Sequence, residues 1–543
     1  MIKLRWPLVL AYLCGLGLWG GHLFPRLGVD IFPKADMGQF EMRLRAPTGT
    51  RIEQTEATAL KALDIIKDEA GADNIDISLG FVGVQPSSYP INTIYLWTGG
   101  PEEAVLDIAL KRGASVPVEA LKERLRKRLA EDMPDVRFSF ENSDIVSRVM
   151  NLGSPTPIEV TVGGPDMPVN RAFAEKVRDA LAQVPTLRDL QIIETTDYPT
   201  VEVNVDRERA GIAGIQMDQV TRSIVAATSS SRFVLPLYWA DPSSGVAYQV
   251  QVEIPEAQMH SAEDIRNLLL ARQGQEPVEL RNVAEITEGT AAGRYDRYNM
   301  QRQVTLNANI AGEDLGHASA RIAEALKALG QPPPKVTLSV RGQIQPMQQT
   351  LGELRTGLGL ALVVILLLLA ANFQSFLLTL TVLSAVPAVL AGALTALWLT
   401  GATVNMESFM GAVMAVGVCV ANAILLVTFA ERSRVTGMTS AAAAASGATS
   451  RLRPILMTSL AMIAGMLPMA MKWGGGGEQS APLAAAVIGG LSAATFATLL
   501  ILPAVFTILR RTGARGNPSL HPDDMEQAHG HTQDIPAHEQ EGA

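Results

Sequence analysis

Apolar residues form six runs long enough to cross a lipid bilayer, and a mainly polar stretch separates the first run from the other five. The runs cover residues 6–24, 355–371, 376–400, 408–430, 454–471 and 481–509. A helix that crosses the hydrocarbon core needs about 20 mainly apolar residues. The pattern therefore predicts one transmembrane helix (1–28), a large soluble part, and a bundle of five transmembrane helices (351–511).

The first run also has features of a secretory signal peptide, because a short basic start precedes it. However, no small-residue cleavage site follows, and the next residues read PRLGVDIFPKAD. We therefore interpret this run as an uncleaved transmembrane helix.

Arginine and lysine residues predict the orientation of the six spans. They gather before the first run, between the fourth and fifth runs, and after the sixth: Lys3, Arg5, Arg432, Arg434, Arg451, Arg453, Arg510, Arg511 and Arg515. With six crossings, all of these positions fall on one side, whereas the opposite short loops hold only Lys472. The basic side is predicted to be cytoplasmic. The large domain is then on the outer side of a bacterial inner membrane, in the periplasm.

Within the polar stretch, segments with a two-residue hydrophobic period alternate with segments of helical period. The expected strands are 39–46, 75–81, 93–98, 136–140, 158–162, 190–194, 201–205, 303–310 and 336–340, and the expected helices are 51–70, 118–132, 169–183, 217–227 and 317–329. Repeated strand–helix–strand units predict an α/β membrane protein with ferredoxin-like βαβ subdomains. Residues 232–288 break the pattern, with a strand-like run at 247–254 and a short helix at 262–270, and are read as an insertion.

Composition supports this picture and excludes some functions. The chain is 48% hydrophobic and 18% charged, which fits a membrane protein with a large soluble part. Its net charge of -9 argues against nucleic-acid binding. Cys14 and Cys419 both lie in apolar runs, so they cannot build a thiolate metal site in the soluble part. Residues 512–543 are predicted to form a disordered cytoplasmic tail, with weak metal binding by its histidines as the alternative. No cofactor is expected.

The fourth run carries one amide, Asn422, near its middle. Because lipid cannot hydrogen-bond an amide, Asn422 should face other helices, either for packing or for function. Proton-driven transport usually needs a titrating side chain at such a depth. The carboxylates in and beside the runs, Glu353, Glu407 and Glu431, lie near their ends instead. The six runs therefore hold no carboxylate relay of their own.

Several segments resemble the second half of the resistance-nodulation-division (RND) efflux permeases. The segments are ANAILLVTFAERSR (421–434), SRLRPILMTSLAMIAGMLPMAM (450–471), VDIFPKADMGQFEMRLRAPTGTRIEQTE (29–56), VDRERAGIAGI (205–215) and RYNMQRQVTLNANIAGEDLG (297–316). The resemblance extends to about Arg511 and keeps the family's order. It implies porter subdomains at 29–199 and 292–350, with a docking-like insertion at 200–291.

The resemblance also implies partners and a proton-relay region. Such permeases are trimers that use the proton gradient and contact a periplasmic adaptor and an outer-membrane channel. The family's relay aspartates lie in its first half, and its second half usually has a lysine before the asparagine. Here that position is Ala421, and the other matching residues are Asn422, Arg451 and Thr458. Arg451 could instead only set topology, and Thr458 could only bond its own helix.

A second candidate site is the segment LGFVGVQPSS (79–88), which resembles the glycine-bearing switch loop of the porter region. Phe81 could stack on an apolar ligand, and Gly83 and Gln85 lie in the part that would change conformation. A plain connection between strands is the alternative. The soluble part shows no cluster of Met, His or Cys, which favours small amphiphilic substrates over metal ions.

The sequence thus predicts the C-terminal half of an RND exporter, working by proton antiport with an N-terminal half that carries the relay. Because Ala421 replaces the family's lysine, two interpretations stay open. The partner half could supply a different counter-charge, or the coupling of transport to proton movement could be weakened. The alternative is a non-transporting membrane scaffold or degenerate half-permease that binds periplasmic partners. An enzyme is not expected, because the glycine run that ends at Gly477 lacks the Lys-Ser/Thr of a nucleotide-binding loop.

Overall fold

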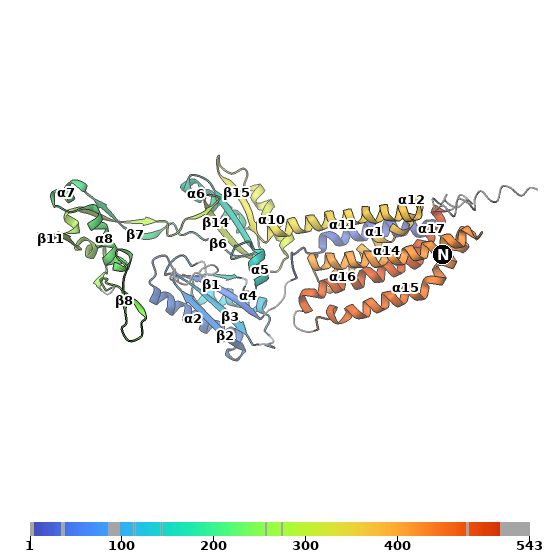
Figure 1. Cartoon of the computed structure of the whole chain (residues 1–543), viewed down its shortest axis with the longest axis horizontal. Coiled ribbons are helices and arrows are strands. Elements are labelled where there is room, and N and C mark those ends of the chain that lie inside the picture. The colour runs from blue at the N-terminus through green and yellow to red at the C-terminus, as the bar shows by residue number, and fades with distance from the viewer. Residues whose placement is uncertain are drawn as a thin grey trace, which may run out of the picture.

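The computed structural model describes residues 5–33, 38–84, 98–111, 113–114, 116–141, 143, 145–255, 258–272, 275–473 and 477–510. The molecule is elongated, with a helical bundle at one end, two α/β sheets in the middle and a smaller unit at the other end (Figure 1). The predicted tail, 512–543, lies outside the described residues.

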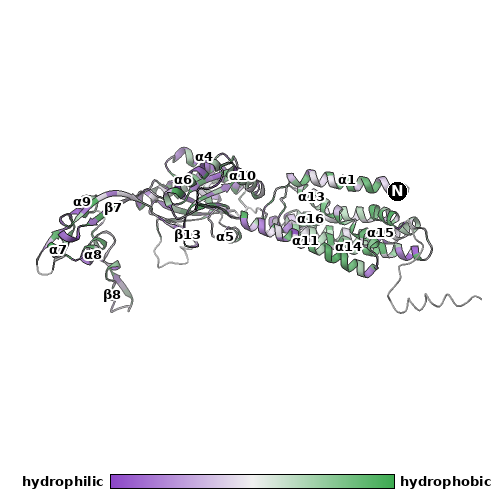
Figure 2. Cartoon of the chain, turned by 90° about the horizontal axis from the view of Figure 1, so that it is seen from above, coloured by the Kyte–Doolittle hydropathy of each residue, from purple (hydrophilic) through white to green (hydrophobic). Residues whose placement is uncertain are grey.

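The bundle contains six helical spans, as predicted, each long and apolar enough to cross a membrane. Their elements are α1 (Arg5–Leu23), α11 (Ile344–Phe373), α12 (Phe376–Leu383), α13 (Val386–Thr400), α14 (Met406–Val435), α15 (Ser440–Ala470), α16 (Gly477–Phe496), a π-helical turn (Ala497–Ile501) and α17 (Leu502–Leu509). Apolar residues dominate this end of the molecule, and polar residues dominate the rest (Figure 2).

Four spans differ from the hydropathy prediction. Helix α11 begins at Ile344, so the expected boundary at residue 350 falls inside a continuous helix. Helix α15 begins at Ser440 and includes the alanine-rich segment as its first turns. The third span breaks before Pro387, and the sixth has its π-helical turn before Pro503. A proline lacks the backbone N–H for an α-helical bond, which accounts for both irregularities.

The first sheet has the strand order β2-β3-β1-β4, with every neighbouring pair antiparallel. Its elements follow the chain as β1 (Gln39–Arg45), α2 (Ile52–Ala70), β2 (Ile75–Val82), β3 (Glu103–Leu110), α4 (Val118–Asp132) and β4 (Arg137–Glu141). Phe40, Met42 and Leu44 belong to the apolar core that includes α2 and α4 residues. Strand β3 was not predicted, because Glu103 and Asp107 interrupt its apolar pattern. The predicted strand at 93–98 lies almost wholly outside the described residues.

The second sheet repeats this arrangement. Its elements are β5 (Ile158–Gly163), α6 (Met167–Leu181), β6 (Leu187–Ile192), β14 (Gln301–Ile310), α10 (Leu315–Ala328) and β15 (Thr337–Gly342), with the short β13 (Asp296–Tyr298) beside β14. Strand β14 pairs with both β6 and β5, and β5 pairs with β15. The predicted strand at 190–194 therefore begins and ends earlier, at Leu187 and Ile192.

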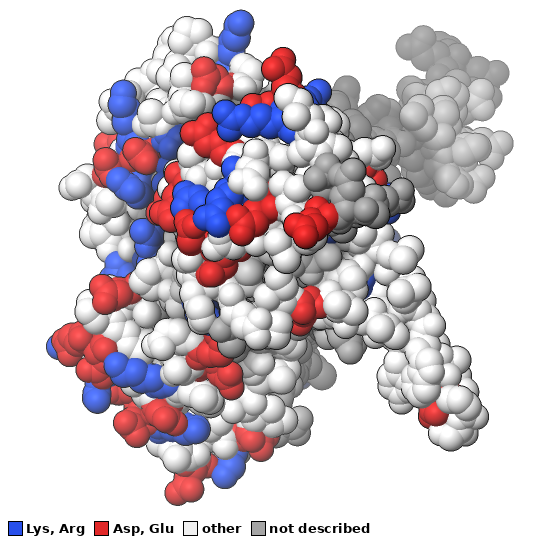
Figure 3. Space-filling model, turned by 90° about the vertical axis from the view of Figure 1, so that its left-hand side faces the viewer, with Lys and Arg blue, Asp and Glu red and all other residues white. Residues whose placement is uncertain are grey.

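The chain leaves the second sheet between β6 and β14 to form the distant unit. Strands β7 (Tyr198–Val205) and β12 (Ala284–Ala291) pair antiparallel along their whole length and connect this unit to the sheet. It contains α7 (Arg207–Ile212), α8 (Met217–Thr228), β8 (Leu237–Ala240), β9 (Ala247–Val250), α9 (Ala262–Arg266), β10 (Leu269–Arg272) and β11 (Gln275–Glu279). The helix predicted at 262–270 is shorter, because Leu269 and Leu270 pair with β11. The β8–β9 hairpin projects as an arm that is almost free of charge (Figure 3).

Candidate substrate cavity and membrane-helix face

Helix α14 has one face packed into the bundle and one face that this chain leaves uncovered. Cys419, Ala423 and Leu426 are buried in the bundle core. Gly417 and Ala421 lie on the exposed face, and a Cβ atom at Gly417 would meet nothing within 4 Å. The uncovered face therefore has small side chains at Gly417 and Ala421, between the larger exposed side chains of Met414 and Leu425. The small positions permit close approach of another helix in a membrane.

Asn422 lies at the edge of this face and is half-buried. Among the described residues, no group forms a hydrogen bond with its side-chain amide. Because a bare amide in a lipid environment is costly, the position of Asn422 favours a polar partner from outside the described chain.

The other two predicted relay residues lie on α15. The Arg451 guanidinium stacks 4.0 Å from the centre of the Phe429 ring on α14, and within the described chain its Nε–H has no acceptor. The Thr458 hydroxyl donates to the carbonyl oxygens of Pro454 and Ile455, both at 3.1 Å. No hydrogen bond or ion pair joins Ala421, Asn422, Arg451 and Thr458 to one another in the part of the chain described. The structure thus puts Arg451 against α14, and the Thr458 hydroxyl is engaged with its own helix.

The described parts of the spans hold no Asp, Glu or Lys near mid-helix. Glu407 lies in the first turn of α14, and Glu431 in its last turns forms ion pairs with Arg434 and Arg510 at 2.8 and 3.1 Å. Glu353 lies in the third turn of the 30-residue α11, which begins at the soluble end of the span. This distribution matches what the sequence pattern predicted.

The predicted switch loop is described only in part. Phe81 is half-buried in β2, and Gly83 follows with a φ of 70°. The positive φ favours glycine here, and a Cβ at Gly83 would lie 2.8 Å from Cδ1 of Ile52, the end of a flexible side chain. Gln85 lies outside the described residues. The role of this segment in substrate contact stays a prediction.

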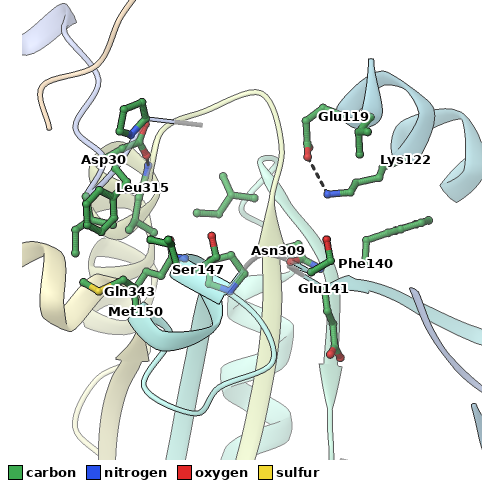
Figure 4. Close-up of a pocket in the computed structure, with 18 of the residues that line it drawn as sticks. Asp30, Glu119, Lys122, Phe140, Glu141, Ser147, Met150, Asn309, Leu315 and Gln343 are labelled. Atoms are coloured by element: carbon green, nitrogen blue, oxygen red, sulfur yellow. Dashed lines mark hydrogen bonds and ion pairs between the residues drawn. The ribbon is translucent and has the colours of Figure 1, made fainter. Parts of the chain in front are cut away.

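A cavity of about 480 Å³ lies where the two sheets meet the end of the bundle that faces the soluble part. Apolar side chains such as Phe32, Phe140 and Met150 line it together with charged ones such as Lys122 and Glu407. The lining comes from the segment after α1, from α4 and β4, from the short helix α5 (Ile145–Met150), from β14 and α10, and from the first turns of α14 and α16. Figure 4 shows Asp30, Leu315 and Gln343 on one side of the cavity and Glu119, Lys122 and Phe140 on the other, with Lys122 donating to Glu119 at 2.9 Å.

Sequence reasoning did not find this cavity. Its walls come from segments far apart in the chain, and they meet only because the second sheet docks on the first. Arg126 of α4 donates to both carboxylate oxygens of Asp189 on β6, at 2.9 and 2.7 Å. Asn309 of β14 donates to the same carboxylate at 2.8 Å. Arg126 and Asn309 both line the cavity, so these contacts hold one of its walls in place.

The face of the first sheet that points away from its helices buries a set of ion pairs. Arg43 donates to Glu141 at 2.7 Å, and Arg45 pairs with Glu103 at 2.5 Å. Glu41 accepts from Arg148 of α5, the helix that lines the cavity. All four side chains on β1 and β3 are less than 10% exposed. Burial, together with the nearby Glu141 carboxylate, raises the pKa of Glu41 to about 9, although Arg148 acts in the opposite direction.

A second buried carboxylate lies on the second sheet. Both oxygens of Glu194 accept from the backbone N–H of Thr305, at 3.0 and 2.9 Å. Burial raises the pKa of Glu194 to about 7, and these hydrogen bonds limit the rise. The soluble part therefore contains one carboxylate, Glu194, that can change charge near neutral pH.

The chain is similar in sequence to bacterial efflux and resistance proteins. A profile of the AcrB/AcrD/AcrF family matches residues 1–510. The chain is 30% identical over 412 residues to the nickel and cobalt resistance protein CnrA of Cupriavidus metallidurans, covering 74% of this chain and 37% of that protein. It is 25% identical over 520 residues to the multidrug resistance protein MdtC of Klebsiella pneumoniae, covering 94% of this chain and 48% of MdtC.

A solved structure with the same fold is the crystal structure of a heavy metal efflux pump. The TM-score is 0.80 at 25% sequence identity, and the match covers 94% of this chain and 50% of the pump. The chain thus spans about half the length, or less, of the relatives it matches.

Proposed function

Since the chain belongs to the AcrB/AcrD/AcrF family of RND efflux permeases, we propose that it is the C-terminal half of an inner-membrane exporter for small amphiphilic compounds. In this proposal the two sheets are ferredoxin-like porter subdomains (29–199 and 292–350) in the periplasm. The unit at 200–291 docks to an adaptor and an outer-membrane channel. The titrating groups for proton antiport lie on an N-terminal half, within a trimer.

The observation that carries the proposal is the uncovered face of α14. It combines small side chains at Gly417 and Ala421 with an amide at Asn422 that has no partner in the described chain. Such a surface suits a neighbouring helix that brings a carboxylate to the amide. Ala421 also leaves room for a counter-charge supplied by the partner.

The cavity supports the choice of substrate class. Its lining mixes apolar side chains with carboxylates and amines, as a ligand with an apolar body and a polar end requires. Among the described residues, no group of three or more His, Cys, Asp or Glu side chains is placed to hold a metal ion. The relatives include both metal-resistance and multidrug proteins, and the lining of the cavity supports our choice of amphiphiles.

Cross-linking in the membrane tests the pairing of halves. The chain with Ala421→Cys, in a background with Cys14 and Cys419 replaced by serine, is co-expressed with a half-permease that has two mid-span aspartates. The partner carries a cysteine one helical turn from those aspartates. We expect an oxidised heterodimer from Ala421→Cys and none from Ala443→Cys, which is buried inside this chain's bundle.

Drug susceptibility is measured in parallel in a strain lacking its major exporters. We expect protection against cationic and neutral amphiphiles only when both halves are present. Protection by this chain alone, or equal cross-linking from both cysteine positions, would contradict the proposal.

A further inference from the structure

The first turn of α10 docks onto the segment that follows the first span. After α1, a short 3-10 turn (Phe24–Arg26) leads into an extended segment. Asp314, the N-cap of α10, accepts from the backbone N–H of Val29 at 2.8 Å. The N–H of Gly316 donates to the Val29 carbonyl at 2.8 Å. The second sheet's helix is thus bonded directly to the exit of the first span.

The same segment is bonded to the bundle on its other side. The N–H of Asp30 donates to the Val404 carbonyl at 3.1 Å, and the N–H of Val404 donates to the Gly28 carbonyl at 2.7 Å. Val404 lies in the loop just before α14. Residues 28–30 therefore form a second connection between the membrane bundle and the second α/β sheet, beside the direct passage from β15 into α11.

His317 closes this connection with both ring nitrogens. Its Nδ1 lies 2.5 Å from the Asp314 carboxylate, and its Nε2 lies 3.2 Å from the carbonyl oxygen of Pro25. Both neighbours are acceptors. A neutral imidazole has one N–H and can serve only one of them, whereas the imidazolium serves both.

The charges around the ring favour the imidazolium form. The hydrogen bond to Asp314 raises the pKa of His317, and the nearby Glu313 carboxylate acts in the same direction. Glu313 is itself paired with Arg321 at 3.0 Å. On the facing segment, Arg26 contacts His22, and Asp30 accepts from the N–H of Leu315. The His317 side chain is 43% exposed, so it can exchange protons with the outer solvent.

We propose that His317 is a proton-sensitive clasp that ties α10 to the exit of the first span when the imidazole is protonated. Deprotonation releases the Pro25 carbonyl and weakens the docking of α10 on residues 28–30. Because the folded-state pKa of His317 is raised, the clasp is complete below the ordinary histidine pKa and is lost as pH rises through the raised value. The proposal concerns the outer side of this chain and does not depend on its transport activity.

Hydrogen exchange of the full chain in lipid nanodiscs tests the clasp. The readout is the protection of the amides of Val29, Leu315 and Gly316, corrected for intrinsic exchange, between about pH 5.5 and about pH 8.5. We expect protection to fall about tenfold across this range, the size of one charge-assisted hydrogen bond. His317→Gln should show low protection at every pH. His260→Gln, at an exposed histidine of the distant unit, should behave as the unaltered chain does.

Asp314→Asn separates the clasp from a general effect of pH on the fold. Asparagine keeps an N-cap oxygen for Val29 and for the helix but removes the charge. The midpoint of the protection change should therefore move to lower pH. Flat protection in the unaltered chain, an undiminished pH response in His317→Gln, or an unmoved midpoint in Asp314→Asn would each overturn the proposal.

Discussion

The membrane bundle and the first α/β sheet differ in where their charged side chains lie. In the bundle, helices meet through glycine and alanine, and the charged side chains lie toward the ends of the spans. A Cβ at Gly489 of α16 would lie 2.3 Å from the carbonyl oxygen of Gly392 on α13. In the first sheet, Arg43, Arg45 and their carboxylate partners are buried on one face.

This difference indicates where protonation can act within the chain. A carboxylate changes charge near neutral pH only where burial or a like charge raises its pKa. In the soluble part, Glu194 meets that condition with a pKa of about 7, and Glu41, with a pKa raised to about 9, changes charge above neutral pH. The described centres of the spans hold no carboxylate at all. This difference supports our proposal that the titrating groups for transport lie on a partner half, and it places the titrating carboxylates of this chain in the soluble part.

The largest expected effect comes from breaking the buried ion pairs. Arg43→Met leaves Glu141 and Glu103 buried beside one cation fewer, and removing one partner of such a pair costs roughly 3–5 kcal/mol. Arg178→Met, which removes an exposed pair with Asp179, should change stability by less than about 0.5 kcal/mol. Pulse proteolysis in urea measures both. Equal stability of the two variants would mean that the buried pairs add nothing.

A charge placed in the neutral bundle should be nearly as disruptive. Ala421→Lys puts an ammonium group on the lipid-facing side of α14 when the chain is alone, at a cost of about 2.5–3.5 kcal/mol. Ala421→Leu should insert normally. Co-expression with a half that carries two mid-span aspartates should restore the yield of Ala421→Lys, measured as folded protein by fluorescence-detection chromatography. Poor yield that the partner does not improve argues against an aspartate-bearing helix beside α14.

Close helix packing gives a smaller effect that is specific to the bundle. Gly489→Val forces α16 away from the backbone of Gly392 and should cost about 1–3 kcal/mol. At Gly465 on α15 a Cβ would meet nothing within 4 Å, so Gly465→Val is the matched control. Thermal inactivation in detergent compares them. Similar midpoints for both variants would contradict the tight contact between α13 and α16.

The last expected effect is on the pH dependence of stability. Because the pKa of Glu41 is raised to about 9 in the folded chain, folding favours its protonated form. That contribution is present below the ordinary glutamate pKa and declines as pH rises toward about 9. Glu41→Gln should therefore flatten the stability profile between about pH 5 and about pH 8. Unfolding by urea across this range measures the slope, and an unchanged slope indicates that Glu41 is charged in the folded chain.

Periodicity predicted most of the elements that have a single strong pattern. The helix at 118–132 and the strands beginning at Gln39 and Ile158 start where predicted, because one face of each is uniformly apolar. The six spans are visible for the same reason. Strand β3 was not predicted because Glu103 and Asp107 interrupt its apolar pattern. These two carboxylates pair with arginines from other segments. The local hydrophobic pattern of a strand does not show which distant arginine will pair with its carboxylates.

The candidate site was predicted only where it depends on one helix. The absence of a mid-span carboxylate and the unpaired amide of Asn422 follow from the sequence of α14 and its neighbours, and the role of Asn422 stays a prediction. The cavity, the buried ion pairs and the contact of His317 with Pro25 join residues that are far apart in the chain. They arise from tertiary docking of the two sheets and the bundle, which no local sequence signal specifies.

Dye efflux from proteoliposomes tests the central claim most directly. The purified chain is reconstituted alone, and a pH gradient is imposed with the side bearing the soluble domain acidic. We predict no gradient-driven movement of an amphiphilic dye, and movement once the aspartate-bearing half is reconstituted with it. Gradient-driven efflux by this chain alone, abolished by a protonophore, would contradict the account.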